Sequence, residues 1–196
     1  CATVAAMLSV DRLEVADSSS HKNSRDHHRG NPLQKIVSAD AFALGDHIVF
    51  LRTFERWQRE RYRRDFAREY SLSERGLEFA KEVRRPLLES MRSLDDNDFV
   101  SFKRSREEEE QYNKKSERSR TKNVRKALAE GFISKIARRG TASNCFKTFA
   151  FETKTLTEVH PSCARALADE DGLLPDWIVY HEMVMTSRPF LRHVCK

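Results

Sequence analysis

The sequence lacks several features that define large classes of proteins. It has no run of about 18 apolar residues, the length that a helix needs to cross a bilayer, so no membrane segment is predicted. None of its six glycines stands in a G-x-x-x-x-G-K-[S/T] loop, and it has no Asp-Glu-Ala-His stretch. Phosphoryl transfer requires a loop that cradles phosphates and carboxylates that hold magnesium. This chain by itself is therefore not expected to hydrolyse ATP.

The sequence also lacks the cysteine and histidine motifs that are typical of metal sites and disulfide frameworks. The four cysteines are scattered, without a Cys-x-x-Cys pair, so neither a zinc ribbon nor a disulfide framework is predicted. His21, His27 and His28 lie in one polar stretch, but no second ligand pair stands at zinc spacing, so no metal site is expected. Such thiols are typical of a reducing, intracellular compartment, nuclear or cytoplasmic. Residues 1–10 lack the basic leading region of a signal peptide and an initiator Met, which indicates a piece of a longer chain.

Positive charge is concentrated in one segment. The net charge of the chain is +6, and residues 101–140 hold 13 Lys or Arg against 6 Asp or Glu. A basic segment beside an otherwise balanced fold favours a polyanionic partner, most simply nucleic acid. A solvated connector between two folded parts would have a similar composition, and the charge alone does not separate these two interpretations.

The first half of the chain has the pattern of a small helical bundle. Apolar residues recur at helical spacing over 48–57 and again over 77–91, which predicts two helices that each bury one face. Residues 17–35 are almost entirely polar, with Ser, His, Asn, Gly and Pro, and predict a loop or a disordered insertion. Residues 1–93 are therefore predicted to form one helical domain that carries this insertion.

Four residues mark helix boundaries in this domain. Asp46 is predicted to be an N-cap, because its carboxylate can accept hydrogen bonds from the first turn of the following helix. Ser71 and Glu74 have the spacing of a capping box. Pro86 lies inside the last apolar stripe, where it predicts a kink or a break, since an interior proline costs about 3 kcal/mol.

The second half changes character. Residues 94–122 are polar and indicate a linker or a solvated helix, with a domain boundary. The apolar spacing over 124–136 predicts one short helix. Strand-like segments rich in aromatic or β-branched residues follow at 146–151, 153–159 and 177–185. Short strands so closely spaced predict a small barrel over residues 123–196, and hence an α+β fold.

The segment Trp177 to Met185 is the clearest strand, and it carries two titratable residues, His181 and Glu182. No nucleophile or paired carboxylate accompanies them, so general acid–base catalysis is not favoured. Because buried polar groups need partners, we expect Tyr180, His181 and Glu182 to form hydrogen bonds that join the barrel to the helical domain. The rings of Trp177 and Phe190 are predicted to lie in the core.

The aromatic residues around position 150 allow a second interpretation. Phe146, Phe149 and Phe151 cannot all face the same side of a strand. One set of these rings is therefore a candidate platform on which bases stack.

The order of these landmarks resembles the C-terminal region of DEAH-box RNA helicases, in which a helical, ratchet-like domain leads into an OB-fold. The matching segments in the helical part are Ala6-Met-Leu-Ser-Val10, Gly45-Asp-His47 with Leu51 and Trp57, and Phe66, Glu69, Leu72, Arg75, Leu77, Ala80, Val83, Arg84 and Leu87. The most specific match is Pro175-x-Trp-Ile-Val-Tyr-His-Glu182, followed by Thr186 and Phe190-x-Arg192. Phe66-Ala67 and Pro86 depart from the family pattern, which has Trp-Cys and Gln there, so this is a divergent member.

The resemblance implies an organisation and a set of partners. Residues 1–93 would be the ratchet-like domain with its insertion at 17–35, residues 94–122 a charged linker, and residues 123–196 the OB-fold. The partners would be single-stranded RNA, the helicase motor domains and a helicase-activating protein. ATP and magnesium would bind the motor domains, which this chain does not contain.

The resemblance also implies RNA-binding residues. They are Lys147, Thr148, Lys154, Arg75 and Arg84. A solvated strand face is the other explanation for the first three, and helix-packing salt bridges explain the two arginines equally well. A protein-interaction module that does not bind RNA is the alternative function.

Overall fold

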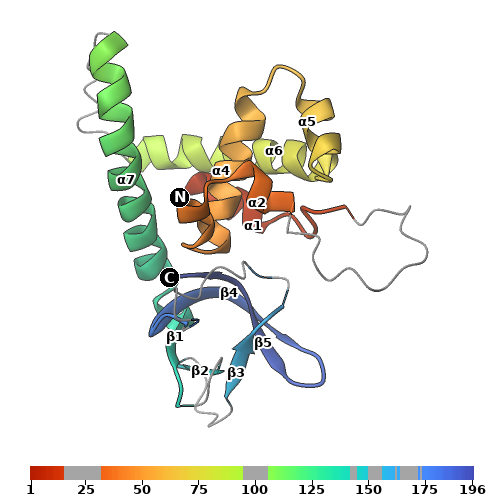
Figure 1. The fold of residues 1–196 in the computed structure, drawn as a ribbon, viewed down its shortest axis with the longest axis vertical. Helices are drawn as coiled ribbons and strands as arrows, with labels where there is room; N and C mark the ends of the chain where they lie inside the picture. The colour runs from red at the N-terminus through yellow and green to blue at the C-terminus, as the bar shows by residue number, and fades with distance from the viewer. Residues whose placement is uncertain are drawn as a thin grey trace.

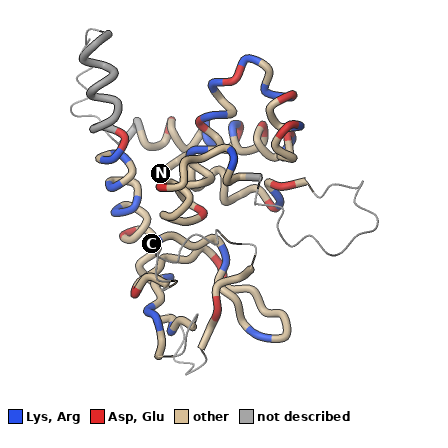
Figure 2. The backbone as a smooth tube through the Cα atoms, viewed as in Figure 1, with Lys and Arg blue, Asp and Glu red and all other residues tan. Residues whose placement is uncertain are grey.

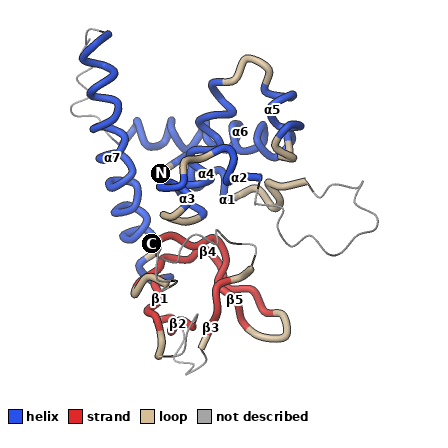
Figure 3. The backbone as a smooth tube through the Cα atoms, viewed as in Figure 1, coloured by secondary structure: helices blue, strands red, loops and turns tan. Residues whose placement is uncertain are grey.

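Helices precede strands in the computed structural model, which describes residues 1–15, 32–94, 106–141, 145–149, 156–161, 163, 172 and 174–196. The helices are α1 (Ala2–Leu8), α2 (Pro32–Ile36), α3 (Ala39–Phe42), α4 (Asp46–Arg59), α5 (Arg63–Glu69), α6 (Glu74–Leu94), α7 (Arg106–Gly131) and the 3₁₀ turn η1 (Ile133–Lys135). The strands are β1 (Ile136–Arg139), β2 (Cys145–Thr148), β3 (Thr157–Val159), β4 (Trp177–Met185) and β5 (Pro189–Cys195). The predicted α+β fold, a helical bundle followed by a barrel, is confirmed (Figures 1 and 3).

The bundle is built around α4. The predicted stripe Ile48, Leu51, Phe54 and Trp57 is buried along its length. Phe54 and Trp57 are fully buried in one cluster with Leu77 of α6. Each large side chain removed from water in this way contributes about 1.5–3 kcal/mol. None of the helices within the described ranges is long and apolar enough to cross a membrane.

The predicted insertion at 17–35 is shorter than expected at its C-terminal end. Residues 32–36 form α2, and Leu33 and Ile36 are buried in the bundle core. The loop prediction was wrong for residues 32–35 because one turn with two apolar side chains is too short to show a period. Proline at the first position of α2 also favours a helix start. Residues 16–31 lie outside the described ranges.

Helix boundaries in α6 differ from the prediction. The N-cap is Ser73 and not Ser71: the Ser73 hydroxyl accepts a hydrogen bond from the Gly76 N–H at 3.0 Å, whereas Ser71 has a φ of 51° in the turn before the helix. Of the predicted kink or break at Pro86, the break is wrong, because α6 continues through this residue, and the kink stays a prediction. Pro86 is exposed, so its ring and the lost backbone hydrogen bond face solvent and not a packed neighbour.

Helix α7 joins the two parts of the molecule. It spans residues 106–131 and therefore continues uninterrupted through residue 122, where the domain boundary was predicted. Residues 94–122 were interpreted as a linker or as a solvated helix, and the structure shows a helix from residue 106 onward. The position of the domain boundary stays a prediction. The short helix predicted to reach Ile136 was wrong at its end, because Ile136 begins β1.

The strands form a closed barrel in the order β1-β2-β3-β5-β4. Strands β3 and β5 run parallel, whereas every other pair is antiparallel. Its core contains Ala137, Phe146, Leu191 and Val194, each fully buried. Inward residues alternate with outward ones along β1, β2 and the first half of β4, so the register decides which side chains reach the surface.

The barrel rests against the N-terminus of α4. The prediction that Asp46 is the N-cap of α4 was wrong, because Asp46 is the first residue of the helix. Its Oδ2 accepts a hydrogen bond from the Val194 N–H of β5 at 2.9 Å, and both residues are buried. Gly45 pairs with Cys195 of β5 and has a φ of 106°. A Cβ at position 45 would clash with the Val194 carbonyl oxygen and lie 2.8 Å from the Cys195 Cα. The Gly-Asp pair thus lets a helix end meet a strand backbone directly.

Candidate nucleic-acid interface

Three outward side chains meet where β1, β2 and β4 lie side by side. Arg138 of β1 is paired with Lys147 of β2 on one side and with Trp177 of β4 on the other. Directly paired residues project from the same face of a sheet, and all three of these side chains are exposed. Figure 2 shows Lys and Arg positions along β1 and along α7 on the same side of the molecule.

A pair of stacked rings completes this surface. The rings of Phe149 and Trp177 lie 5.8 Å apart between centroids with an interplanar angle of 11°, although they are 64% and 50% exposed. The Arg138 guanidinium carbon lies 5.6 Å from the Trp177 ring centroid. We call Arg138, Lys147, Phe149 and Trp177 the aromatic–basic face. It combines flat rings that can stack on bases with cations that can contact phosphates.

The structure contradicts the predicted position of Trp177 and confirms that Phe146 and Phe149 face different sides. Trp177 was expected in the core, but Ile178 is the buried residue at this end of β4, so alternation turns Trp177 outward. Phe146 is fully buried whereas Phe149 is exposed, so these two rings indeed face different ways. Phe190 lies in the interior as expected, with 9% of its surface exposed, and Phe151 lies outside the described residues.

The predicted RNA contacts in the barrel are not all brought together. Lys147 belongs to the aromatic–basic face. Thr148 is paired with the fully buried Ala137, so it projects from the opposite, inner side of the sheet. Lys154 lies outside the described residues.

The two predicted arginines of α6 lie in the bundle, away from the aromatic–basic face (Figure 1). Arg84 donates a hydrogen bond from Nε to the Thr3 hydroxyl at 2.8 Å, and its guanidinium carbon lies 5.7 Å from the Phe54 ring centroid. These contacts are those of a packing residue. Arg75 is exposed near the start of α6. Their assignment as RNA contacts stays a prediction.

Tyr180, His181 and Glu182 occupy three different environments. Tyr180 is buried in the barrel core, and burial raises the pKa of its hydroxyl. Glu182 pairs across the ladder with Arg192 at 3.1 Å. The His181 carbonyl accepts a hydrogen bond from Lys135 Nζ at 2.6 Å. Among the described hydrogen bonds, those from barrel to bundle come from other residues, such as Asp46, so a linking role of these three side chains stays a prediction.

A row of rings nevertheless runs through the junction of barrel and bundle. Ring contacts of 5.3–6.1 Å between centroids lead from His47 through Phe132, His181 and His193 to Phe50. Burial, which disfavours the charged imidazolium, lowers the pKa of His47 to about 3 and, with the nearby Arg192, that of His193 to about 4. Near neutral pH these histidines are therefore uncharged packing elements.

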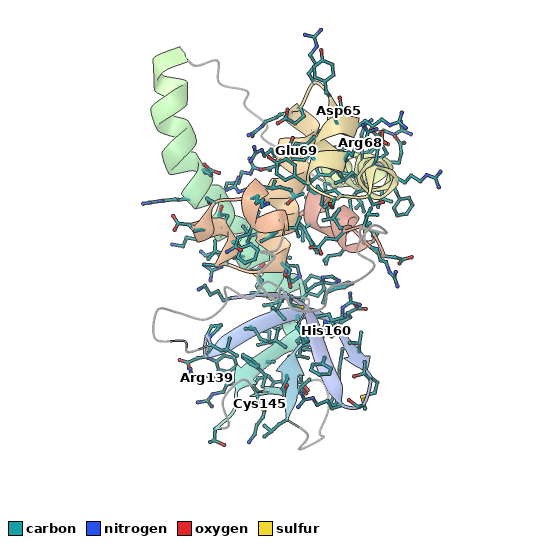
Figure 4. The ribbon with its side chains drawn as sticks, turned by 45° about the vertical axis from the view of Figure 1, so that its right-hand side comes forward. Asp65, Arg68, Glu69, Arg139, Cys145 and His160 are labelled. Carbon is teal, nitrogen blue, oxygen red and sulfur yellow. The ribbon has the colours of Figure 1, made fainter. Side chains whose placement is uncertain are left out.

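Charged side chains of both signs lie at the end of the molecule far from the barrel (Figure 4). Figure 4 places Arg68 with Asp65 and Glu69 on α5, opposite Arg139 and Cys145 at the lower end of the barrel. Arg68 forms an exposed ion pair with Asp65 at 3.8 Å. Arg139 donates from Nη1 to the Leu174 carbonyl at 2.7 Å and so holds the chain that leads into β4. Among the described residues, no three His, Cys, Asp or Glu side chains gather as a metal site requires.

Two members of the aromatic–basic face escaped sequence reasoning. Arg138 was not among the predicted RNA contacts, and Trp177 was predicted to lie in the core. The alternation around buried Ile178 offers a signal for Trp177, because neighbouring strand residues face opposite sides. The sequence offers none for Arg138, since its position beside Trp177 depends on the pairing of β1 with β4.

Comparison with known proteins agrees with this geometry. Residues 124–196 match a family described as the oligonucleotide/oligosaccharide-binding (OB)-fold. Over 149 residues, 76% of the chain, the sequence is 25% identical to the pre-mRNA-splicing factor ATP-dependent RNA helicase Prp22 of Schizosaccharomyces pombe, and the matched region covers 11% of that protein. The barrel therefore matches the OB-fold family, and the chain is distantly similar, over most of its length, to an ATP-dependent RNA helicase of which it spans only a small part.

Proposed function

We propose that this chain is an RNA-handling module of an ATP-dependent RNA helicase, and that it grips single-stranded RNA on the aromatic–basic face. The observation that carries the proposal is the exposed, stacked pair of Phe149 and Trp177 with the Arg138 guanidinium beside it. Large apolar rings left in water at one place indicate a binding surface. Cations next to them fit a polyanionic ligand better than an apolar one.

The chemistry of this face suits an unpaired strand. Stacking of one base on an aromatic ring is worth about 1–3 kcal/mol and does not depend strongly on sequence. Arg138 and Lys147, adjacent across the ladder, would each neutralise a phosphate. Each phosphate neutralised on a single strand adds about 0.7 to the slope of log affinity against log salt. Two contacts predict a slope of about −1.4 from this face alone.

The wider role is proposed from the similarity to Prp22. In a helicase, motor domains outside this chain would bind ATP and magnesium and move RNA, while this module holds the strand between steps. A helicase-activating protein would be a further partner. Because Prp22 is described as a pre-mRNA-splicing factor, RNA processing in the nucleus is the setting that we propose.

Titration of a fluorescein-labelled uridine dodecamer with the 196-residue chain, followed by anisotropy at several salt concentrations, tests the proposal. Phe149→Ala should weaken binding by about 1–3 kcal/mol, and Arg138→Gln should reduce the salt slope by about 0.7. Phe79→Ala is the matched control, because Phe79 is also an exposed ring, 51% accessible against 64% for Phe149, but lies on α6.

Three results would refute the proposal: no detectable binding, binding that does not change with salt, or an equal effect of Phe149→Ala and Phe79→Ala. Absence of RNA binding would favour the alternative, a module that binds only proteins.

A further inference from the structure

Two grooves meet along one side of α7. The first, of about 740 Å³, lies between α3–α4 and α7. Its charged lining residues are the cations Arg52, Arg118, Lys122 and Arg125 and the carboxylates Asp40 and Glu117, so positive charge is in excess. The second, of about 450 Å³, lies between α7 and strands β1 and β4 and is lined by Leu128, Ala129, Ile136 and Val179. Arg125 lines both, so the basic groove and the apolar groove adjoin at this residue.

The basic groove keeps cations available for a partner. Arg52 on its floor forms ion pairs with Glu55 at 3.1 Å and with Glu117 at 2.9 Å, so its charge is already balanced. Arg118 and Lys122 are exposed and take part in none of the ion pairs between described residues. A ligand that carries carboxylates would therefore meet two cations on successive turns of α7.

The apolar groove has a different character. Its aliphatic wall comes from α7 on one side and from the barrel on the other, and its charged lining residues are the cations Arg125 and Lys196. Arg125 Nε donates to the Lys196 carbonyl at 2.6 Å, which fixes the end of the groove. A volume of 300–1,000 Å³ is about that of pockets that enclose small ligands, so this groove has room for one or two large apolar side chains.

From these two adjoining grooves, one with cations outside the described ion pairs and one with an aliphatic wall, we propose that they dock an acidic, amphipathic peptide of a protein partner. An apolar anchor residue of the peptide fills the groove between α7 and β4, and carboxylates that follow it lie along Lys122 and Arg118. The charge complementarity selects an acidic segment. The aliphatic wall favours a protein over RNA. It has no hydrogen-bond partner for the edge of a base, and it cannot replace the water that a phosphate would lose on binding.

This inference is independent of RNA binding on the aromatic–basic face. Trp177 borders both surfaces. The remaining groove residues belong to α7, to β1 at Ile136, and to β4 and its neighbour β5. Substitutions on α7 therefore address the peptide site, whereas Phe149→Ala addresses the RNA site.

Selection of a phage library of random dodecapeptides on the 196-residue chain tests the proposal. Enriched peptides should carry net negative charge and at least one large apolar residue. The most enriched peptide, synthesised with a fluorescein label, is then titrated with the wild-type chain and with variants. Binding should be displaced by unlabelled peptide and weakened by salt.

Two matched pairs of variants distinguish an effect at the grooves from a general effect of added negative charge. Ala129→Glu places a carboxylate in the apolar groove, and Ala127→Glu places the same charge at an exposed position of α7 that lines neither groove. Ala129→Glu should weaken binding at least tenfold, which corresponds to about 1.4 kcal/mol, and Ala127→Glu should change it less than twofold. Lys122→Glu should likewise weaken binding more than Lys126→Glu, because Lys126 lies outside both grooves.

Several outcomes overturn the proposal. These are no enrichment of acidic peptides, equal affinity of the Ala129→Glu and Ala127→Glu variants, or loss of uridine-dodecamer binding specific to Ala129→Glu, which would assign the groove to RNA. A dimer in solution that only Ala129→Glu dissociates would assign the groove to a second copy of the chain. Thermal unfolding of each variant shows that the fold is retained, and the Lys122 pair tests the site even if position 129 tolerates no charge.

Discussion

Removing the Asp46 carboxylate should uncouple the barrel from the bundle. In the structure its Oδ2 accepts the Val194 N–H at 2.9 Å, across an interface where both residues are buried. The same carboxylate stands in the first turn of α4, where negative charge is favoured by the helix dipole. One side chain therefore satisfies a strand backbone and stabilises a helix end.

Two contributions set the magnitude for Asp46→Ala. The orphaned Val194 N–H costs about 1–3 kcal/mol, and the lost interaction with the dipole of α4 costs about 0.3–1 kcal/mol. The expected decrease in the free energy of unfolding is thus about 1.3–4 kcal/mol. Asp46→Asn keeps an oxygen acceptor and loses only the charge, so it should cost about 1 kcal/mol.

Urea unfolding of the two variants measures these free energies. Asp40→Ala is the matched control, because Asp40 also lies in the first turn of a helix but is exposed, and it should cost less than about 1 kcal/mol. If Asp46→Ala costs no more than Asp40→Ala, the buried hydrogen bond does not hold the two parts together and this reasoning is refuted. If Asp46→Asn costs as much as Asp46→Ala, charge and not the acceptor is what matters.

Two more predictions concern the same junction. Gly45→Ala should lower the free energy of unfolding by about 2–5 kcal/mol, since a positive φ and a clash with the β5 backbone add strain and overpacking; Gly131→Ala, with open space around it, should cost nothing in the same urea assay. Acidification should also destabilise the fold. Histidines titrate near pH 6.5 when unfolded, whereas the folded-state pKa is about 3 for His47 and about 4 for His193. Between these values the unfolded chain binds more protons, so stability falls as the pH falls, by about 2 kcal/mol per histidine from pH 7 to pH 5; urea unfolding at the two pH values with unchanged free energy would contradict this.

Local patterns predicted the elements with a clear period. The stripe of α4 and the strand Trp177 to Met185 were visible in the sequence because a helix or strand with one buried face repeats its apolar residues every 3.6 or every two positions. The resemblance to DEAH-box helicases rested in part on the same two segments. The comparisons agree with it, since the barrel matches the OB-fold family and the chain is distantly similar to an RNA helicase. Short elements such as α2 were missed because one turn shows no period.

The roles of single polar residues were less accessible. Asp46 is a residue type that N-caps favour and stands just before the apolar stripe of α4. The sequence gives no sign that its hydrogen-bond donor is the backbone of Val194, in a strand about 150 residues later. Ser73 replaced Ser71 as the cap of α6 because the turn before the helix bends at Ser71. Which residue caps a helix depends on the path of the backbone just before it, and this path cannot be read from the residue types alone.

By itself the sequence determined the order of a helical bundle and a barrel, their main apolar faces, and the absence of nucleotide-binding motifs, because each of these depends on neighbours along the chain. Only the tertiary structure decided that Arg138 stands between Lys147 and Trp177, that Thr148 faces inward, and that the Trp177 ring stacks on Phe149. Strand register sets these contacts, and a shift of one residue would turn every side chain to the other face. Register is fixed by packing between segments far apart in the chain, and therefore the binding surface emerges only when the barrel closes.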